Sequence, residues 1–174
     1  MDGIRIARFT GFTLIELMVV IGLVSIMQGL VIPTFARLVE SSRIYFAAHT
    51  LRVDLRSAQA ASARLRQFIR VCPSASGLSC DADNNWQQGW ITYREAEHFA
   101  GEPFFRRILF HQHARKGLRI SANGIGNSVR FAPDYRIGSN FSLTICGNSR
   151  EVPGLAVVVT QVGRIRIEKV AVSC

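Results

Sequence analysis

The sequence lacks a recognisable arrangement of catalytic or metal-binding residues. It contains four cysteines and four histidines, and no two cysteines have the Cys-x-x-Cys spacing that would favour a zinc site. His111 and His113 share a face of an expected strand, with His98 or His49 as a distant third ligand, which makes a weak metal site. No Ser/His/Asp, Cys/His or paired-carboxylate arrangement stands out. We therefore expect no enzyme, no cofactor and no metal.

Lysine and acidic residues are also scarce. Of the 21 basic residues only Lys116 and Lys169 are lysines, and 12 acidic residues leave a formal net charge of +9. Guanidinium groups make planar, forked contacts with phosphate that an ammonium cannot match. Nucleic acid and anionic lipid headgroups are both candidate ligands of such a surface. The alternative is that the arginines serve only for solubility.

Apolar residues are abundant near the N-terminus. The segment from Leu17 to Ala36 carries no charge, and its length is about what a helix needs to cross ~30 Å of hydrocarbon. Arg5 and Arg8 precede this segment, so the positive-inside bias places the N-terminus in the cytoplasm. Glu16 lies within the apolar register, where a carboxylate costs about 2.5 to 3.5 kcal/mol and needs a partner or a task. We expect a membrane span over about residues 12–36.

The order of these features differs from that of a secretory signal, in which the apolar region precedes the cleavage site. Here the apolar run follows Gly11, with Phe12 next and Glu16 five residues into the product. This pattern resembles the class III signal of type IV pilins and pseudopilins. The resemblance implies that residues 1–11 are a leader, that prepilin peptidase cuts after Gly11 and that Phe12 is N-methylated. It also implies that Glu16 pairs with the Phe12 amine of a neighbouring subunit.

Beyond Pro33 an apolar stripe continues at steps of three and four residues. It comprises Ile44, Ala48, Leu51, Leu55, Ala58, Leu65 and Ile69. This periodicity predicts that the helix continues as an amphipathic rod to about Arg70, so the N-terminal helix would span 12–70. A second stripe of Arg52, Arg56, Arg66 and Arg70 is interpreted as a solvated face.

Residues 71–174 are expected to form a β-rich head. Short apolar or alternating runs occur at 89–94, 104–110, 118–122, 128–131, 141–146, 155–162 and 164–170. Turn residues separate them and no helical stripe intervenes, so the strands should be antiparallel. The predicted fold class is α+β, one long N-terminal helix packed on an antiparallel head. Trp86 and Trp90 are expected to pack where the helix meets the sheet.

All four cysteines, Cys72, Cys80, Cys146 and Cys174, follow the predicted span. The inferred topology places them in the oxidising periplasm, where an even number indicates disulfides. Four cysteines allow three pairings, and the sequence does not decide among them. We favour the two local pairs, Cys72 with Cys80 and Cys146 with Cys174.

The C-terminal segment reads as a β-hairpin. The turn Thr160-Gln161-Val162-Gly163 uses a glycine that is free to take positive φ. Alternation on the next strand sends Ile165 and Ile167 to one face and Arg164 and Arg166 to the other. Two forked cations ~7 Å apart roughly match successive phosphates of a nucleic acid strand. The alternative is a basic turn that protects an edge strand from aggregation.

Together these features resemble the FimT/GspH group of minor pilins and pseudopilins. The matching residues are the Gly11–Glu16 signal, Trp86 with Gly89-Trp90, the paired cysteines and Gly163-Arg164-x-Arg166. FimT-like minor pilins that bind DNA carry a Gly-Arg-x-Arg element at this place. The resemblance therefore implies DNA binding by Arg164 and Arg166 beside Gly163. Lys169, Arg136 and Arg150 are candidate neighbours only.

We expect a minor type IV pilin that binds extracellular double-stranded DNA for uptake in natural transformation. Its partners would be other major and minor pilins, prepilin peptidase and, before assembly, the bacterial inner membrane, with the head periplasmic and later on a cell-surface pilus. The alternative is a structural minor pseudopilin of a type II secretion system that binds no DNA. A third interpretation, an isolated single-pass membrane protein, requires the signal to be coincidental.

Overall fold

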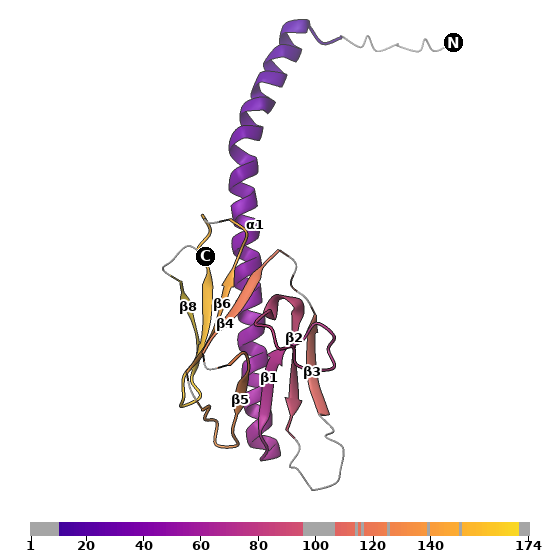
Figure 1. Ribbon diagram of the computed structural model, residues 1–174. Helices are drawn as coiled ribbons and strands as arrows, with labels where there is room; N and C mark the ends of the chain where they lie inside the picture. The colour runs from indigo at the N-terminus through magenta and orange to yellow at the C-terminus, as the bar shows by residue number, and fades with distance from the viewer. Residues whose placement is uncertain are drawn as a thin grey trace, which may run out of the picture. The chain divides into compact units, whose positions relative to one another are not determined.

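The computed structural model of the protein describes residues 11–95, 107–113, 115, 117–124, 126–138, 140–149 and 151–170, without the side chains of 29–31. The chain divides into two compact units, Met1–Leu38 and Val39–Cys174. Helix α1, Leu14–Leu65, runs through both units, and the eight strands found among the described residues belong to the second (Figure 1).

The first unit contains the apolar part of α1. The Thr13 hydroxyl accepts a hydrogen bond from the Glu16 amide (3.3 Å), which caps the start of the helix. Every described side chain in 11–28 and 32–38 is exposed. Among the described residues, α1 is the one helix long and apolar enough to cross a membrane, and its most apolar window, with a mean hydropathy of 2.3, has no buried share. The length and composition of this helix agree with the expected span.

The helix ends at Leu65, so the prediction that it continues to about Arg70 was wrong. Arg66 adopts a left-handed φ of 52°, and its amide and the next one bond back to carbonyls of the last turn, which terminates the helix. Ile69 continues the helical spacing, but it is β-branched and begins strand β1, Ile69–Pro73, where it is fully buried. An apolar residue at this position fits both the helical and the strand spacing. The pairing of β1 with its neighbouring strands therefore decides that Ile69 belongs to a strand.

The strands form two four-stranded antiparallel sheets. The first has the order β3-β2-β1-β5 and the second the order β4-β6-β7-β8. Besides β1, the strands are β2 Gly89–Arg94, β3 Arg107–His113, β4 Arg119–Asn123, β5 Val129–Phe131, β6 Phe141–Cys146, β7 Leu155–Val159 and β8 Ile165–Lys169. The α+β class is therefore confirmed. Strand β1 was missed, and the first residues of the strand expected at 104–110 lie outside the described residues.

The second half of α1 supplies one wall of the core. Ile44, Ala48, Leu51, Leu55 and Ala58 are all at most 1 % exposed, which confirms the apolar stripe up to Ala58, whereas Leu65 is 36 % exposed and does not belong to the buried face. They pack in one cluster with residues of both sheets. The helix thus positions the two sheets against a common apolar face.

The two tryptophans connect the helix with both sheets. Trp86 and Trp90 are buried, with ring centroids 6.4 Å apart. Trp90 Nε1 donates a hydrogen bond to Asp54 Oδ2 on α1 (3.0 Å), and the Trp86 ring lies 6.0 Å from that of Phe141 in β6. Burial raises the pKa of Asp54, and the hydrogen bond from Trp90 opposes that rise. The expected packing of this pair at the helix–sheet junction is confirmed.

A disulfide joins Cys72 on β1 to Cys80, with Cα atoms 5.6 Å apart. This is the first of the two pairs that we favoured from sequence. Cys146 is also disulfide-bonded, while Cys174 lies outside the described residues. The pairing of Cys146 with Cys174 therefore stays a prediction.

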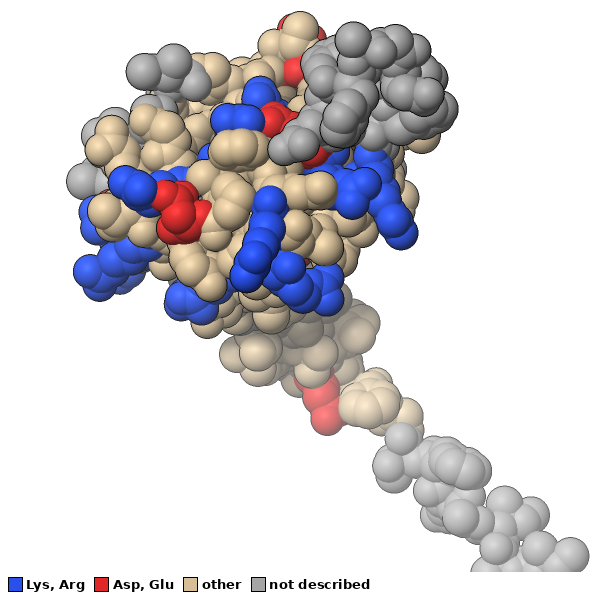
Figure 2. Space-filling model, turned by 90° about the horizontal axis from the view of Figure 1, so that it is seen from below, with Lys and Arg blue, Asp and Glu red and all other residues tan. Residues whose placement is uncertain are grey.

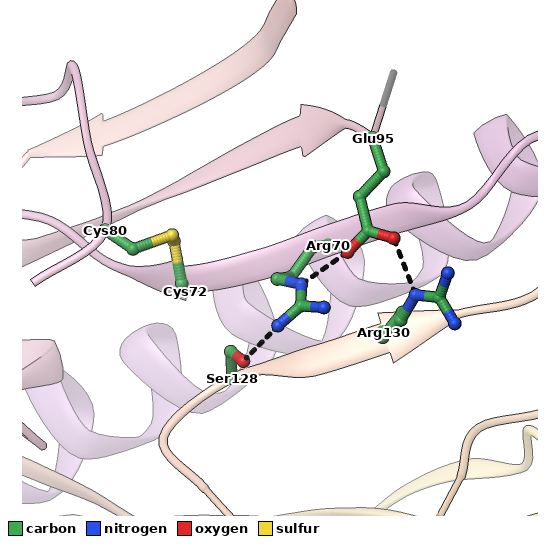
Figure 3. A network of polar contacts seen from close by, with 6 residues as sticks. All are labelled: Arg70, Cys72, Cys80, Glu95, Ser128 and Arg130. Atoms are coloured by element: carbon green, nitrogen blue, oxygen red, sulfur yellow. Dashed lines mark hydrogen bonds and ion pairs between the residues drawn. A yellow bond between two sulfur atoms is a disulfide. The ribbon is translucent and has the colours of Figure 1, made fainter. Parts of the chain in front are cut away.

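Glu95, just after β2, ties three strands together (Figure 3). Its two carboxylate oxygens accept hydrogen bonds from Arg70 Nε on β1 and Arg130 Nε on β5, each at 2.6 Å. Arg70 also lies 3.5 Å from the Ser128 hydroxyl. The interpretation of Arg70 as part of a solvated helical face was therefore wrong. Arg70 lies on a strand and belongs to an ion-pair network.

The Glu95 network should make the stability of the head depend on pH. Burial alone would raise the pKa of Glu95, but the hydrogen bonds from Arg130 and Arg70 outweigh it and lower the pKa below 4.5. The carboxylate therefore stabilises the fold above pH 4.5, and this contribution is lost as the pH falls through the lowered value. We expect Glu95→Gln to cost about 1–2 kcal/mol at pH 7 and progressively less below pH ~4.5.

Urea unfolding followed by the fluorescence of the two buried tryptophans measures this effect. The exposed Asp83 provides the control, since Asp83→Asn removes a carboxylate outside the network. A loss of stability that is the same at pH 7 and pH 3.5 would show that the charge of Glu95 is not responsible.

Candidate nucleic-acid interface

The turn between β7 and β8 has the geometry that the sequence predicts. Gly163 has a φ of +80°, its amide bonds to the Thr160 carbonyl (2.7 Å), and the Thr160 amide bonds to the Arg164 carbonyl (3.0 Å). The side chain of Ile165, the first residue of β8, is buried, while Arg164 just before the strand and Arg166 within it are exposed. The alternation therefore presents both guanidinium groups to solvent.

Gln59 on α1 holds this turn in place. Its Nε2 donates to the carbonyl oxygens of Gly163 (2.7 Å) and Tyr135 (3.2 Å). The Ile137 amide bonds to the Gln161 carbonyl at 3.0 Å, which attaches the turn to the segment after β5. No local sequence pattern marks Gln59, because its contact joins residues 104 positions apart. Arg164 and Arg166 therefore follow a turn that these hydrogen bonds hold in place.

A side chain at position 163 should disrupt this support. An added Cβ would overlap the Tyr135 carbonyl oxygen and lie 2.5 Å from Gln59 Nε2, in a backbone conformation that favours glycine. We expect Gly163→Ala to destabilise the head by about 1–3 kcal/mol in urea unfolding. Gly138→Ala is the matched control, because its Cβ would meet no atom within 4 Å. Equal stability of the two variants would contradict the account of the turn.

Arg164, just before β8, and Arg166 on it border an open groove of ≈ 540 Å³ between β8 and α1. The helix contributes Arg52, Arg56 and Gln59 to its lining, and the strand contributes Arg164 and Arg166. The interpretation of Arg52 and Arg56 as part of a merely solvated face was therefore incomplete. Seen from below the view of Figure 1, the second unit presents several groups of Lys and Arg side chains and fewer acidic ones (Figure 2).

The basic residues near this groove are not equivalent. Arg166 forms an ion pair with Glu168, two residues further along the strand. Arg136 pairs with Asp134 at 2.6 Å, and this hydrogen bond lowers the pKa of Asp134. Lys169 is exposed, but strand alternation places it on the face of Ile165, away from Arg164 and Arg166. Arg150 lies outside the described residues.

The expected metal candidates do not converge on a site. The rings of His111 and His113 lie 4.6 Å apart on β3, whereas His49 lines the arginine groove and His98 is not described. In the described part of the chain, no group of three His, Cys, Asp or Glu side chains is placed to hold a metal ion.

The residues expected at the processing site lie exposed at the start of the described chain. Phe12 is 84 % exposed, Glu16 is exposed in the first turn of α1, and no atom approaches within 4 Å of a Cβ at Gly11.

Residues 47–163 match the family of type II transport protein GspH. The chain belongs to this family. Residues 6–29 match the prokaryotic N-terminal methylation motif, which covers the Gly11–Glu16 signal. The family and the methylation motif make the protein a structural, pilin-like subunit of the minor pilin or pseudopilin kind rather than an enzyme. Family membership implies other pilins as partners and processing by prepilin peptidase.

Solved structures show the same fold at low sequence identity. The type IV minor pilin FimU of Pseudomonas aeruginosa is 16 % identical over 79 % of this chain and 99 % of its own, with a TM-score of 0.59. The minor pseudopilin EpsH of the Vibrio cholerae type 2 secretion system is 10 % identical over 73 % of this chain and 97 % of its own, with a TM-score of 0.50. A search of curated proteins finds no match.

Proposed function

We propose that this GspH-family protein is a minor type IV pilin whose head binds extracellular duplex DNA for uptake in natural transformation. The observation that supports the proposal is the clamped turn at Gly163, which holds Arg164 and Arg166 on the exposed face of β8. Exposed guanidinium groups on a rigid support bind phosphate oxygens with little loss of conformational entropy.

Binding of this kind depends on the charge of the DNA backbone rather than on the base sequence. Phosphate contacts position a protein on the duplex without distinguishing bases, and the mature chain attracts a polyanion from a distance, because loss of Arg5, Arg8 and Asp2 with the leader leaves a net charge of 9 − (2 − 1) = +8. Lys169 and Arg136 are secondary contributors at most, because one lies on the other strand face and the other is ion-paired. DNA is expected to bind largely without sequence preference.

The N-terminal segment delivers the head to its place of action. We propose that prepilin peptidase removes residues 1–11, that Phe12 is then N-methylated and that α1 holds the protein in the inner membrane with the head in the periplasm. On assembly, Glu16 pairs with the Phe12 amine of a neighbouring subunit, which offsets the cost of a carboxylate in an apolar setting. The head then reaches the cell surface as part of a pilus.

A salt titration tests the DNA-binding proposal. The full chain is placed in nanodiscs of zwitterionic lipid, so that no anionic headgroup competes, and binding of a fluorescein-labelled 30-base-pair duplex is followed by fluorescence anisotropy. Three or four phosphate contacts predict that log K falls against log salt with a slope of about −3. Absence of binding at low salt contradicts the proposal.

The second candidate function is that of a structural minor pseudopilin in a type II secretion system. The ion pairs Arg166–Glu168 and Arg136–Asp134 favour it, because they neutralise basic groups that a phosphate would otherwise contact. Under this alternative the head contacts other pseudopilins, and the anisotropy experiment shows no saturable DNA binding.

A further inference from the structure

The groove between α1 and β8 has a helical wall that the terminal arginine motif does not account for. Arg52 and Arg56 lie four residues apart on α1, so their side chains are neighbours on one helical face. They face the groove that Arg164 and Arg166 border from the strand side. The groove thus has a pair of arginines on each wall.

The helical pair has no counter-charge among the described residues. In the part of the chain that the structure describes, no ion pair or side-chain hydrogen bond engages Arg52 or Arg56. The Nε of Arg52 is moreover buried without a hydrogen-bond partner. A buried donor of this kind is costly to leave unpaired, but it has no exposed surface, so a ligand in the groove would meet the rest of the Arg52 guanidinium group rather than this nitrogen.

The guanidinium groups of Arg164 and Arg166 are less available to a phosphate than the Gly-Arg-x-Arg motif implies. Glu168 already pairs with Arg166, so a phosphate must compete with this carboxylate for the guanidinium group. Arg164 has no such partner among the described residues. Three of the four groove arginines therefore have guanidinium groups ready for an anion, and two of these three come from the helix.

The spacing on the two walls is similar. Arginines four apart on a helix have Cβ atoms about 5–6 Å apart, and arginines two apart on a strand are about 7 Å apart. Both spacings suit contacts to neighbouring phosphates on one strand of a nucleic acid, with forked donors approaching from both sides.

We propose that the groove between α1 and β8 seats a single phosphodiester backbone of the duplex, with Arg52 and Arg56 as binding residues of the same rank as Arg164 and Arg166. This inference rests on the proposed function and extends it by naming the second wall of the site. Arg52 and Arg56 contact the phosphates that Arg164 and Arg166 contact from the other side.

The test compares two double variants of the full chain in zwitterionic nanodiscs, using the same labelled duplex. Arg52→Gln with Arg56→Gln removes the helical pair. Arg43→Gln with Arg64→Gln removes the same charge from the same helix outside this groove. The loss of two phosphate contacts should lower the affinity for the duplex on the order of fifty-fold at 0.1 M salt. It should also make the slope of log K against log salt less steep by about 2. The control pair should change affinity by less than about threefold.

A lysine version separates lost binding from lost folding. Arg52→Lys with Arg56→Lys keeps both charges and should recover most of the affinity, with tryptophan fluorescence showing that each variant has a folded head. If the helical glutamine pair behaves like the control pair while Arg164→Gln with Arg166→Gln abolishes binding, the inference about the helix is overturned and the proposed function stands. If the unmutated chain does not bind, both are overturned.

Discussion

Exchange of Arg164 and Arg166 for glutamine should lower the affinity of the protein for duplex DNA on the order of fifty-fold at 0.1 M salt. The reason is the loss of two phosphate contacts from a turn that Gln59 and the segment after β5 hold rigidly. Fluorescence anisotropy with the labelled duplex measures the change.

The matched control for this change is the pair Arg43→Gln and Arg64→Gln, which has the same net charge. Both side chains are exposed on α1, outside the groove. If the two double variants bind equally well, the effect is one of net charge alone and the Gly163 turn has no special role. Glutamine also removes the Arg166–Glu168 ion pair, but an exposed pair of this kind contributes little to stability.

Exchange of Gly11 for alanine should leave the chain uncut in cells that contain prepilin peptidase. The methylation motif covers this position, and the resemblance to pilin signals implies a cut between Gly11 and Phe12. The parent should yield a product whose mass corresponds to a chain that begins with N-methylated Phe12. The variant should persist at the mass of the full precursor, and intact mass spectrometry of the membrane fraction measures both.

Gly22→Ala is the control for processing, because it introduces the same methyl group eleven residues further along the chain, within α1, where no atom lies within 4 Å of the new Cβ. It should be trimmed like the parent. A Gly11→Ala chain that is trimmed to the parental mass would show that the cut does not depend on Gly11, and a different product mass would place the cut elsewhere.

Local patterns predicted the parts of the molecule that local physics controls. The Gly163 turn and the outward direction of Arg164 and Arg166 follow from a glycine with positive φ and from strand alternation, which need only neighbouring residues. The buried stripe of α1 follows from its 3.6-residue period in the same way. The disulfide between Cys72 and Cys80 joins residues only eight positions apart.

The parts that sequence reasoning missed depend on contacts between distant residues. Ile69 fits the helical stripe, but pairing with β2 and β5 places it in a strand. Gln59 is an unremarkable polar residue until the fold brings Gly163 within hydrogen-bonding distance. Arg52 and Arg56 were interpreted as a solvated face because their opposite wall, β8, lies more than a hundred residues away in the chain.

The ion pairs of Glu95 with Arg70 and Arg130 could not be predicted from sequence for the same reason. Neither spacing nor composition distinguishes these arginines from the rest of a chain with a net charge of +9. Only the sheet order β2-β1-β5 brings one carboxylate between them. The structure therefore separates arginines that stabilise the head from arginines that remain available to a ligand.

The most direct test of the central claim is the anisotropy of a labelled 30-base-pair duplex titrated with the full chain in zwitterionic nanodiscs at low salt. The account predicts saturable binding that weakens steeply as salt is added, that Arg164→Gln with Arg166→Gln weakens on the order of fifty-fold and that Arg43→Gln with Arg64→Gln leaves nearly unchanged. Absence of binding by the unmutated chain at low salt would contradict it and would favour the structural role of a secretion pseudopilin.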